Sequence, residues 1–185
     1  MKLLNIILII FIALTNEIKA DSKNQLFEKL QKGGNLIFIR HAYAPGNGDP
    51  DNFDIKDCST QRNLSDSGRK QSEKIGNFFN ENKIPIDLVI SSEWCRCKET
   101  ALIAFDKFKT KDFLNSFYSS KFAKNKKFQI LNLKKYIDNW NEDKNLVLIT
   151  HYVVISEVLN YAPSSGEIVV SDKNFKIIGN IEIDY

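Results

Sequence analysis

The stretch that decides the fold of this chain is a short apolar run that ends in two chemically active side chains: Leu36, Ile37, Phe38, Ile39, Arg40, His41 and Ala42. Such a run is typical of a strand that is buried on both faces. Turn-forming residues follow it, so we expect a loop to begin where this strand ends. In α/β folds such loops collect ligands, because the strand holds the base of the loop rigid. An imidazole and a guanidinium at that place predict a site for an anion.

The chain contains only two histidines, so any imidazole chemistry must use His41, His151 or both. His151 has the same local setting, because a second apolar run over residues 145–149 and then Thr150 precede it. The carboxyl ends of parallel strands lie at the same edge of a sheet. The sequence therefore predicts that two buried strands bring both histidines to one edge.

The remaining residues alternate between helical and strand patterns. Helices are expected over residues 22–32, 65–82, 93–105, 130–140 and 153–161, and strands over residues 86–90, 113–118, 167–171 and 175–183. Within the 130–140 helix, the residues expected to face the core are Leu131, Leu133, Ile137 and Trp140. The alternation predicts an α/β fold, a three-layer sandwich with a mostly parallel central sheet flanked by helices and an antiparallel hairpin at the C-terminal edge.

Length and charge narrow the classes of protein. At 185 residues, 43% of them hydrophobic, the chain suits one well-cored domain. Its net charge of +3 comes from 26 basic and 23 acidic residues that are spread along the sequence. No charge block points to a nucleic acid or a membrane surface, so we expect neither as a partner. The oligomeric state stays open.

The N-terminus has the pattern of a secretory signal peptide over residues 1–20. Lys2 precedes an apolar run from Leu3 to Leu14, and Ala20 stands directly before Asp21. The run is short for a membrane span, although an uncleaved N-terminal anchor is the alternative. We expect a mature domain over residues 21–185 that is periplasmic or secreted and has no stable membrane insertion after cleavage.

Export affects how the three cysteines are interpreted. In an oxidising compartment Cys58 could pair with Cys95 or with Cys97, which would tie the long loop after His41 to the segment around Arg96. The alternative is three buried thiols that pack as small hydrophobic side chains. The Cys-x-Cys spacing does not match the common structural zinc sites.

The loop over residues 42–63 is long, polar and rich in turn-forming residues. Loops of this length in a compact domain usually cover or bind a ligand. It contains four aspartates, Asp49, Asp51, Asp54 and Asp57. The glycine and the closing glutamate of a calcium-binding loop are missing, so we expect no metal there.

Four separated motifs together resemble the histidine phosphatase superfamily, which has the phosphoglycerate-mutase-like fold. The first is Arg40-His41-Ala42, which is similar to the family's Arg-His-Gly signature, with Asn47 after it. The other motifs are Leu64, Ser65, Gly68, Arg69 and Gln71; then Ser91, Ser92, Arg96, Thr100 and Ala101; and finally Thr150 and His151. Because they occur in the family's order between residues 35 and 160, they are far more specific than a lone Arg-His pair.

The resemblance implies a phosphatase that needs no metal or cofactor and acts on a small phosphorylated substrate. His41 would attack phosphorus and form a phosphohistidine, which water then cleaves. Arg40, Arg96 and His151 would bind the phosphoryl group, because fixed donors stabilise the charge that develops on its oxygens. The second ring nitrogen of His41 is expected to donate to a backbone carbonyl.

Three further residues, Asn47, Arg62 and Glu167, are candidates for substrate binding. The chain departs from the family in three places, because Ala42 replaces the signature glycine, Glu93 stands where many members have proline, and Tyr152 stands where some members have an acid. Asp54 or Glu167 could protonate the leaving group, and a good leaving group would need no acid.

Two other functions are alternatives to the phosphatase. A non-catalytic domain of the same fold would bind a phosphorylated ligand without turnover. A thiol redox protein would need Cys95 and Cys97 to cycle, and Cys-x-Cys is a poor spacing for that chemistry.

Overall fold

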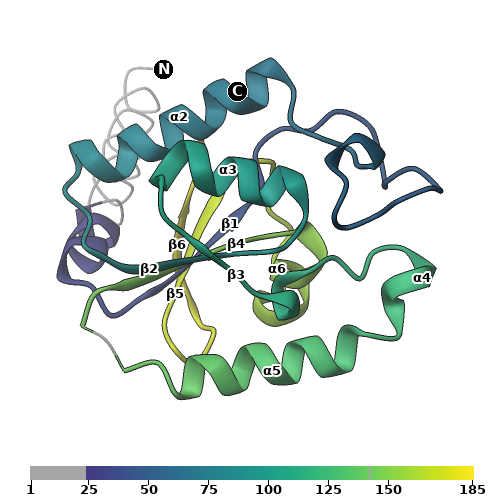
Figure 1. The fold of residues 1–185 in the computed structure, drawn as a ribbon. Coiled ribbons are helices and arrows are strands. Elements are labelled where there is room, and N and C mark those ends of the chain that lie inside the picture. Colours follow the sequence, from purple (N-terminus) through teal and green to yellow (C-terminus); the bar gives the residue numbers. More distant parts are fainter. Residues whose placement is uncertain (1–23, 142) are drawn as a thin grey trace, which may run out of the picture.

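The structure, a computed structural model, describes residues 24–141 and 143–185 (Figure 1). The predicted signal peptide lies outside these residues. Within them, six strands form one sheet in the order β3-β2-β4-β1-β5-β6. The strands are β1 (Leu36–Arg40), β2 (Ile86–Ser91), β3 (Lys109–Thr110), β4 (Asn145–Thr150), β5 (Ile168–Ser171) and β6 (Ile177–Ile181).

The sheet is mixed, as predicted. β1 pairs in parallel with β4, and β2 pairs in parallel with both β4 and β3. The C-terminal hairpin of β5 and β6 is antiparallel and joins the other side of β1. Arg40 lies opposite Thr150 in the register. His41 and His151 therefore follow neighbouring strands at one edge of the sheet, which confirms that prediction.

Helices cover both faces of the sheet and form three layers (Figure 1). The helical residues 24–32, α2 (Asp66–Glu81) and α3 (Cys95–Phe105) pack on one face, against the side chains of Ile37 and Ile39. On the other face α5 (Lys126–Asp138) and α6 (Tyr152–Leu159) pack against Leu36 and Phe38. Successive residues of β1 thus enter two separate cores, which explains why the strand is apolar throughout.

The segment after α3 differs from the prediction, because residues 113–118 do not form a strand. A 3-10 turn, η2 (Asp112–Leu114), and irregular chain replace it, and the short edge strand β3 lies just before. Phe113, Leu114 and Phe117 are all buried in the second core. A strand would place adjacent residues on opposite faces, so burial of two neighbours together requires a turn.

The prediction for the 130–140 helix is partly wrong. Leu133 and Ile137 are buried on α5, as expected, because four residues separate them on one helix face. Leu131 lies on the opposite side and is 62% exposed. Trp140 is buried but follows the end of the helix. The buried position one turn before Leu133 belongs to Gln129, whose Nε2 donates to the carbonyls of Asp112 and Asn115.

The other helices agree with the prediction to within a few residues at their ends. Ser65 caps α2 as expected, since its Oγ accepts from the amide of Gly68. α6 ends at Leu159, two residues before the predicted end at residue 161, because Asn160 takes the left-handed conformation. A further short helix, α4 (Ser120–Ala123), precedes α5, and a 3-10 turn, η1 (Cys58–Thr60), lies in the long loop after β1.

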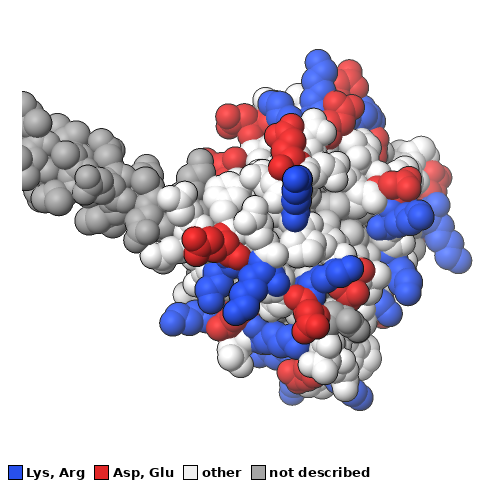
Figure 2. Space-filling view, turned by 90° about the vertical axis from the view of Figure 1, so that its left-hand side faces the viewer, with Lys and Arg blue, Asp and Glu red and all other residues white. Residues whose placement is uncertain are grey.

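The surface of the described residues carries interspersed charges. On the face in Figure 2, basic and acidic side chains alternate over short distances. Over residues 24–141 and 143–185, no helix combines the length and the apolar content that a membrane crossing requires.

Candidate functional site

A cavity of about 280 Å³ opens at the sheet edge where β1 and β4 end. Arg40, His41, Arg96 and His151 all contribute to its lining. The two imidazole rings lie 5.5 Å apart between centroids. The guanidinium of Arg96 lies between them, with Nε 3.2 Å from His41 Nε2 and NH2 3.4 Å from His151 Nδ1. The structure thus brings together the four residues that the resemblance singles out.

His41 is held in one orientation by its own chain. Its Nδ1 lies 2.8 Å from the carbonyl oxygen of Ala42, so this nitrogen carries the proton and donates. The expected contact to a backbone carbonyl is confirmed. Nε2 therefore keeps its lone pair, which accepts from Arg96 Nε. Burial, and then the charge of Arg96, hold the pKa of His41 well below its usual value, so the imidazole is neutral.

Residues of α2 and α3, the helices that contain the second and third motifs, fix the backbone after His41. The amide of Ala42 donates to Thr100 Oγ1 at 3.1 Å, and the amide of Tyr43 donates to Gln71 Oε1 at 2.9 Å. Gly68 lets α2 approach this loop, because a Cβ there would lie 2.0 Å from the carbonyl oxygen of Tyr43. Ala42 does not have a positive φ, so alanine replaces the family's glycine without strain.

His151 is oriented by a chain of hydrogen bonds. Asn115 Oδ1 accepts from Ser92 Oγ at 3.0 Å, and the oxygen of Ser92 lies 2.9 Å from His151 Nε2. Since the hydroxyl proton of Ser92 points to Asn115, His151 Nε2 donates to Ser92 and Nδ1 faces Arg96. Burial and then the Arg96 charge hold the pKa of His151 well below its usual value. Both rings of the site are therefore neutral.

Arg40 has donor capacity that the protein does not use. Its NH1 donates to the carbonyl of Pro163 at 2.9 Å. Its Nε is buried and has no hydrogen-bond partner among the residues that the structure describes. A charged donor that is buried without a partner is costly, and an anion in the cavity would satisfy it.

The prediction from sequence missed Asp49, which binds Arg96 through both carboxylate oxygens. NH1 donates to Oδ1 at 2.7 Å and NH2 to Oδ2 at 3.2 Å. Trp94 Nε1 and the amide of Arg62 also donate to this carboxylate. Burial opposes its ionisation, but the hydrogen bonds and charge of Arg96 outweigh that effect and lower the pKa of Asp49. Nothing in the sequence separates Asp49 from the other three aspartates of the loop.

Asn47 and Arg62 both line the cavity. Asn47 is exposed at its mouth, where Nδ2 lies 3.4 Å from the hydroxyl of Tyr118. Arg62 braces the loop, since its Nε donates to the carbonyl of Gly48 at 2.8 Å and its NH1 to the carbonyl of Ala44. Burial, and then the neighbouring Arg96, lower the pKa of Arg62 to about 10.

Glu167 and Asp54 do not belong to the cavity lining, which argues against either as substrate ligand or proton donor. The buried carboxylate of Glu167 accepts from Tyr161 Oη, from the amide of Ser164 and from Asn180 Nδ2. These contacts stabilise the turn that carries Pro163. Asp54 accepts from the amide of Lys56 within its own loop.

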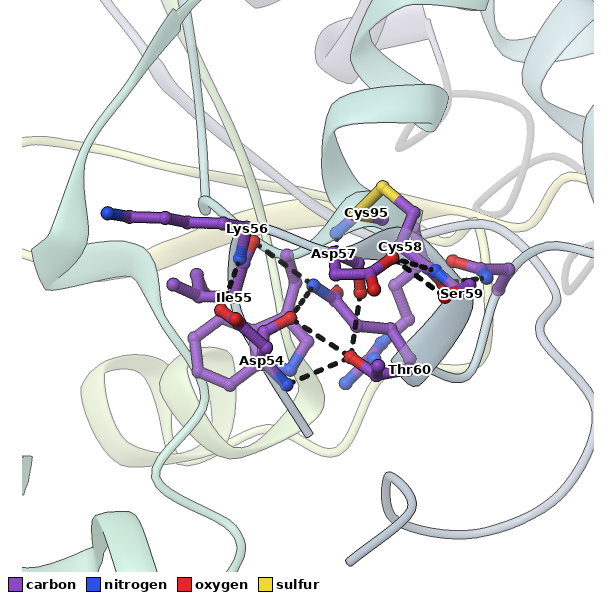
Figure 3. The surroundings of a disulfide bond; sticks show 12 residues. Asp54, Ile55, Lys56, Asp57, Cys58, Ser59, Thr60 and Cys95 are labelled. Atoms are coloured by element: carbon purple, nitrogen blue, oxygen red, sulfur yellow. Dashed lines mark hydrogen bonds between the residues drawn. A yellow bond between two sulfur atoms is a disulfide. The ribbon is translucent and has the colours of Figure 1, made fainter. Parts of the chain in front are cut away.

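A disulfide joins Cys58 in η1 to Cys95 at the start of α3, with 5.7 Å between the two Cα atoms (Figure 3). The expectation that Cys58 pairs with one member of the Cys-x-Cys pair is therefore confirmed. Cys97 is free and buried, and burial raises the pKa of its thiol to about 12. Because Cys95 is already bonded to Cys58, it does not form a redox pair with Cys97.

Metal ligands do not gather in the part of the chain that the structure describes. In residues 24–141 and 143–185, no group of three or more histidine, cysteine, aspartate or glutamate side chains is placed to hold a metal ion. The cavity instead presents cationic donors around two neutral imidazoles, which suits an anionic ligand.

The fold is the phosphoglycerate-mutase-like α/β fold that the resemblance implies. Residues 36–115 match the family model of the histidine phosphatase superfamily (branch 1), which confirms the resemblance found in the sequence. The matched stretch includes His41 and Arg96. His151 lies beyond it, and the structure joins it to the other two. No curated protein sequence matches the chain.

Solved structures share the fold at low sequence identity. The protein histidine phosphatase SixA complexed with tungstate is 14% identical, with 81% of this chain and 96% of that chain covered and a TM-score of 0.56. Phosphoglycerate mutase from Thermus thermophilus is 15% identical, with 81% and 99% covered and a TM-score of 0.56. A mycobacterial glucosyl-3-phosphoglycerate phosphatase in complex with VO3 is 13% identical, with 75% and 92% covered and a TM-score of 0.56.

Proposed function

We propose that the chain is an exported phosphatase that hydrolyses phosphate monoesters through a phosphohistidine on His41. The observation that carries this proposal is the arrangement of His41 Nε2, which is unprotonated and within 3.2 Å of a guanidinium nitrogen of Arg96. A nucleophile and a donor for the phosphoryl oxygens are thus side by side. The relatives named above with tungstate or VO3 bind phosphate-like oxyanions, which supports the same use of this fold.

The proposed reaction has two steps, formation and then hydrolysis of the phosphohistidine. The lone pair of His41 Nε2 forms a bond to phosphorus, and the bond from phosphorus to the leaving oxygen breaks with its electron pair. The leaving oxygen takes up a proton from solvent. A water molecule then attacks the phosphohistidine, and the P–N bond breaks with its electron pair returning to Nε2. Inorganic phosphate leaves with the hydroxyl from that water, and the other proton of the water goes to solvent. The contact of Nδ1 with the carbonyl of Ala42 keeps the proton on that nitrogen, so Nε2 keeps the lone pair that attacks.

Arg40, Arg96 and His151 stabilise the phosphoryl oxygens. The partnerless Nε of Arg40 gains an acceptor, and Arg96 exchanges the Asp49 carboxylate for the substrate. A phosphoryl dianion offsets the positive charge of Arg96 and Arg40 beside His151, which raises the pKa of the ring. The ring then takes up a proton, and Nδ1 becomes a third donor. All these groups act by positioning and charge, and the residues of the cavity require no metal for it.

The disulfide supports an exported location. Bonds of this kind form and persist in oxidising compartments such as the periplasm. The signal-peptide pattern over residues 1–20 agrees with that location.

Hydrolysis of p-nitrophenyl phosphate by residues 21–185 in the presence of a chelator tests the proposal. We expect turnover that is abolished in His41→Ala, and an acid-labile phosphate that is trapped on the wild type only. Glu157→Gln, on an exposed ion pair with Lys126, is the matched control and should leave turnover unchanged. Phosphate binding without turnover would instead identify a non-catalytic binding domain, and dependence on a metal would refute the mechanism.

A further inference from the structure

One wall of the cavity is built from aromatic rings whose faces take no part in the proposed phosphoryl chemistry. The rings of Phe53 and Trp94 stack with 4.9 Å between centroids. Phe122 meets both of them edge-on at 5.5 Å. Trp94 in turn lies edge-on to His151 at 5.4 Å, so the wall begins directly beside a group that binds the phosphoryl oxygens.

Two more aromatic residues stand at the mouth of the same cavity. Tyr118 is 56% exposed and Tyr152 is 41% exposed. The guanidinium carbon of Arg40 lies 5.8 Å from the ring centroid of Tyr152, so an aromatic side chain also flanks the proposed phosphoryl-binding residues on this side. Phe53 and Phe122 are only half-buried. Ring surface is therefore available to whatever is attached to the phosphoryl group.

The size of the cavity limits that group. Its volume of about 280 Å³ lies just below the range of roughly 300–1,000 Å³ that is usual for ligand sites. This space accommodates one phosphoryl group and one ring.

The carboxylates of the cavity point to the same kind of leaving group. Among the described residues, only Asp49 and Asp51 contribute carboxyl groups to the lining. Asp49 is ionised and held by Arg96, and Asp51 is exposed in the loop. An alkyl alcohol has a pKa near that of water, about 15.7, and departs slowly without a proton donor, whereas a phenol has a pKa of about 10.

We infer that this site takes phosphate monoesters of phenols, with the leaving-group ring packed against the half-buried rings of Phe53 and Phe122, which Trp94 supports from behind. This inference rests on the proposed function. The bond between phosphorus and the phenolic oxygen breaks as His41 attacks, and the phenolate leaves with the electron pair and takes its proton from water. The phenol can be a small molecule or a tyrosine side chain, since both present the same ring to the wall.

Two measurements on the mature protein test the inference. The first compares kcat/KM for phenyl phosphate and a phosphotyrosine peptide with kcat/KM for glycerol phosphate and a phosphoserine peptide. The second compares binding of phenylphosphonate with that of methylphosphonate by calorimetry, which removes the difference in leaving-group chemistry. We expect at least about tenfold higher kcat/KM for the phenol esters and about tenfold tighter binding of phenylphosphonate.

A pair of variants locates the effect. Phe122→Leu keeps an apolar side chain but removes a ring, so the phenyl-to-methyl binding ratio should fall about three- to tenfold, the worth of one aromatic contact. Phe128→Leu removes an exposed ring that is not in this cavity and should leave the ratio unchanged.

The outcomes separate this inference from the proposed function. Equal binding of the two phosphonates, or an unchanged ratio in Phe122→Leu, overturns the aromatic subsite while hydrolysis of any monoester keeps the phosphatase. If no monoester is hydrolysed, the proposed function fails, and the phosphonate ratio still decides whether the wall binds a ring. Turnover of the phosphotyrosine peptide but not of phenyl phosphate assigns the source of the phenol to a protein, and the reverse assigns it to a small molecule.

Discussion

Asp49 binds Arg96 through both carboxylate oxygens, in the manner in which a phosphoryl group would be bound. The two N–O distances are 2.7 and 3.2 Å, and the guanidinium is almost fully buried. A substrate must therefore displace this carboxylate before NH1 and NH2 of Arg96 can donate to the phosphoryl oxygens. The loop after β1 thus holds the arginine in place and also competes with the ligand.

The first prediction follows from this competition. Asp49→Asn removes the negative charge but keeps an acceptor for Trp94 Nε1, so an anion meets less competition for Arg96. We expect inorganic phosphate to inhibit the variant about tenfold more tightly than it inhibits the wild type, the worth of a hydrogen bond to a charged group. Weaker inhibition would show instead that Asp49 mainly positions Arg96.

A second prediction concerns the proton on His151. The pKa of this ring lies well below its usual value because of burial and the neighbouring Arg96, and a bound dianion raises it. Sulfate binding, which involves no proton of its own at neutral pH, should therefore take up about one proton and weaken as the pH rises. Calorimetry in buffers of different ionisation enthalpy measures the uptake. His151→Asn should take up less, and equal uptake in the variant contradicts the assignment.

A third prediction concerns stability. The folded-state pKa values of His41 and His151 are both depressed, so only the unfolded chain binds these protons as the pH falls through about 6.5. The free energy of unfolding therefore keeps its full value above that pH and falls below it, by up to about 2.7 kcal/mol per pH unit for two histidines. Urea unfolding between pH 7 and pH 5 measures the slope. It should flatten in His41→Asn/His151→Asn, and an equal slope in both proteins would rule out this origin.

Much of the fold could be predicted from the sequence because its patterns are local. Apolar runs identify β1, β2 and β4, and a serine cap marks the start of α2. The segment around Phe113 resembles a strand only while the spacing of its apolar residues is ignored. Two adjacent side chains that are buried in the same core, as Phe113 and Leu114 are, require a turn.

The candidate site could be predicted only in part for a different reason. Arg40, His41, Arg96 and His151 stand in recognisable motifs, so the sequence identifies them. The pairing of Asp49 with Arg96 depends on the path of an irregular loop, which no periodicity encodes. The same limit applies to Glu167, whose acidic side chain suggested a role in the chemistry although its hydrogen bonds hold a turn.

A fourth prediction separates positioning from proton donation at Glu167. Its carboxylate stabilises the turn of Pro163, whose carbonyl oxygen accepts from Arg40 NH1. We expect Glu167→Gln to raise KM a few-fold through a looser Arg40 and to leave kcat and its pH profile nearly unchanged. A general acid would instead cost about 10²- to 10⁴-fold in kcat and remove one limb of the profile. Steady-state kinetics across pH distinguish the two results.

The fifth prediction concerns the disulfide, which closes a loop of 37 residues between Cys58 and Cys95. Loss of the bond should lower the free energy of unfolding by about 4 kcal/mol, because the unfolded chain regains the freedom of that loop. Activity should fall as well, since Cys95 adjoins Arg96 and Cys58 lies in the same long loop after β1 as Asp49. Urea unfolding and kcat/KM with and without a reductant measure both effects.

Two variants are the controls. Cys58→Ser/Cys95→Ser should behave like the reduced wild type and should not respond to the reductant, and Cys97→Ala should keep the full response. A wild type whose stability does not change on reduction would contradict the pairing.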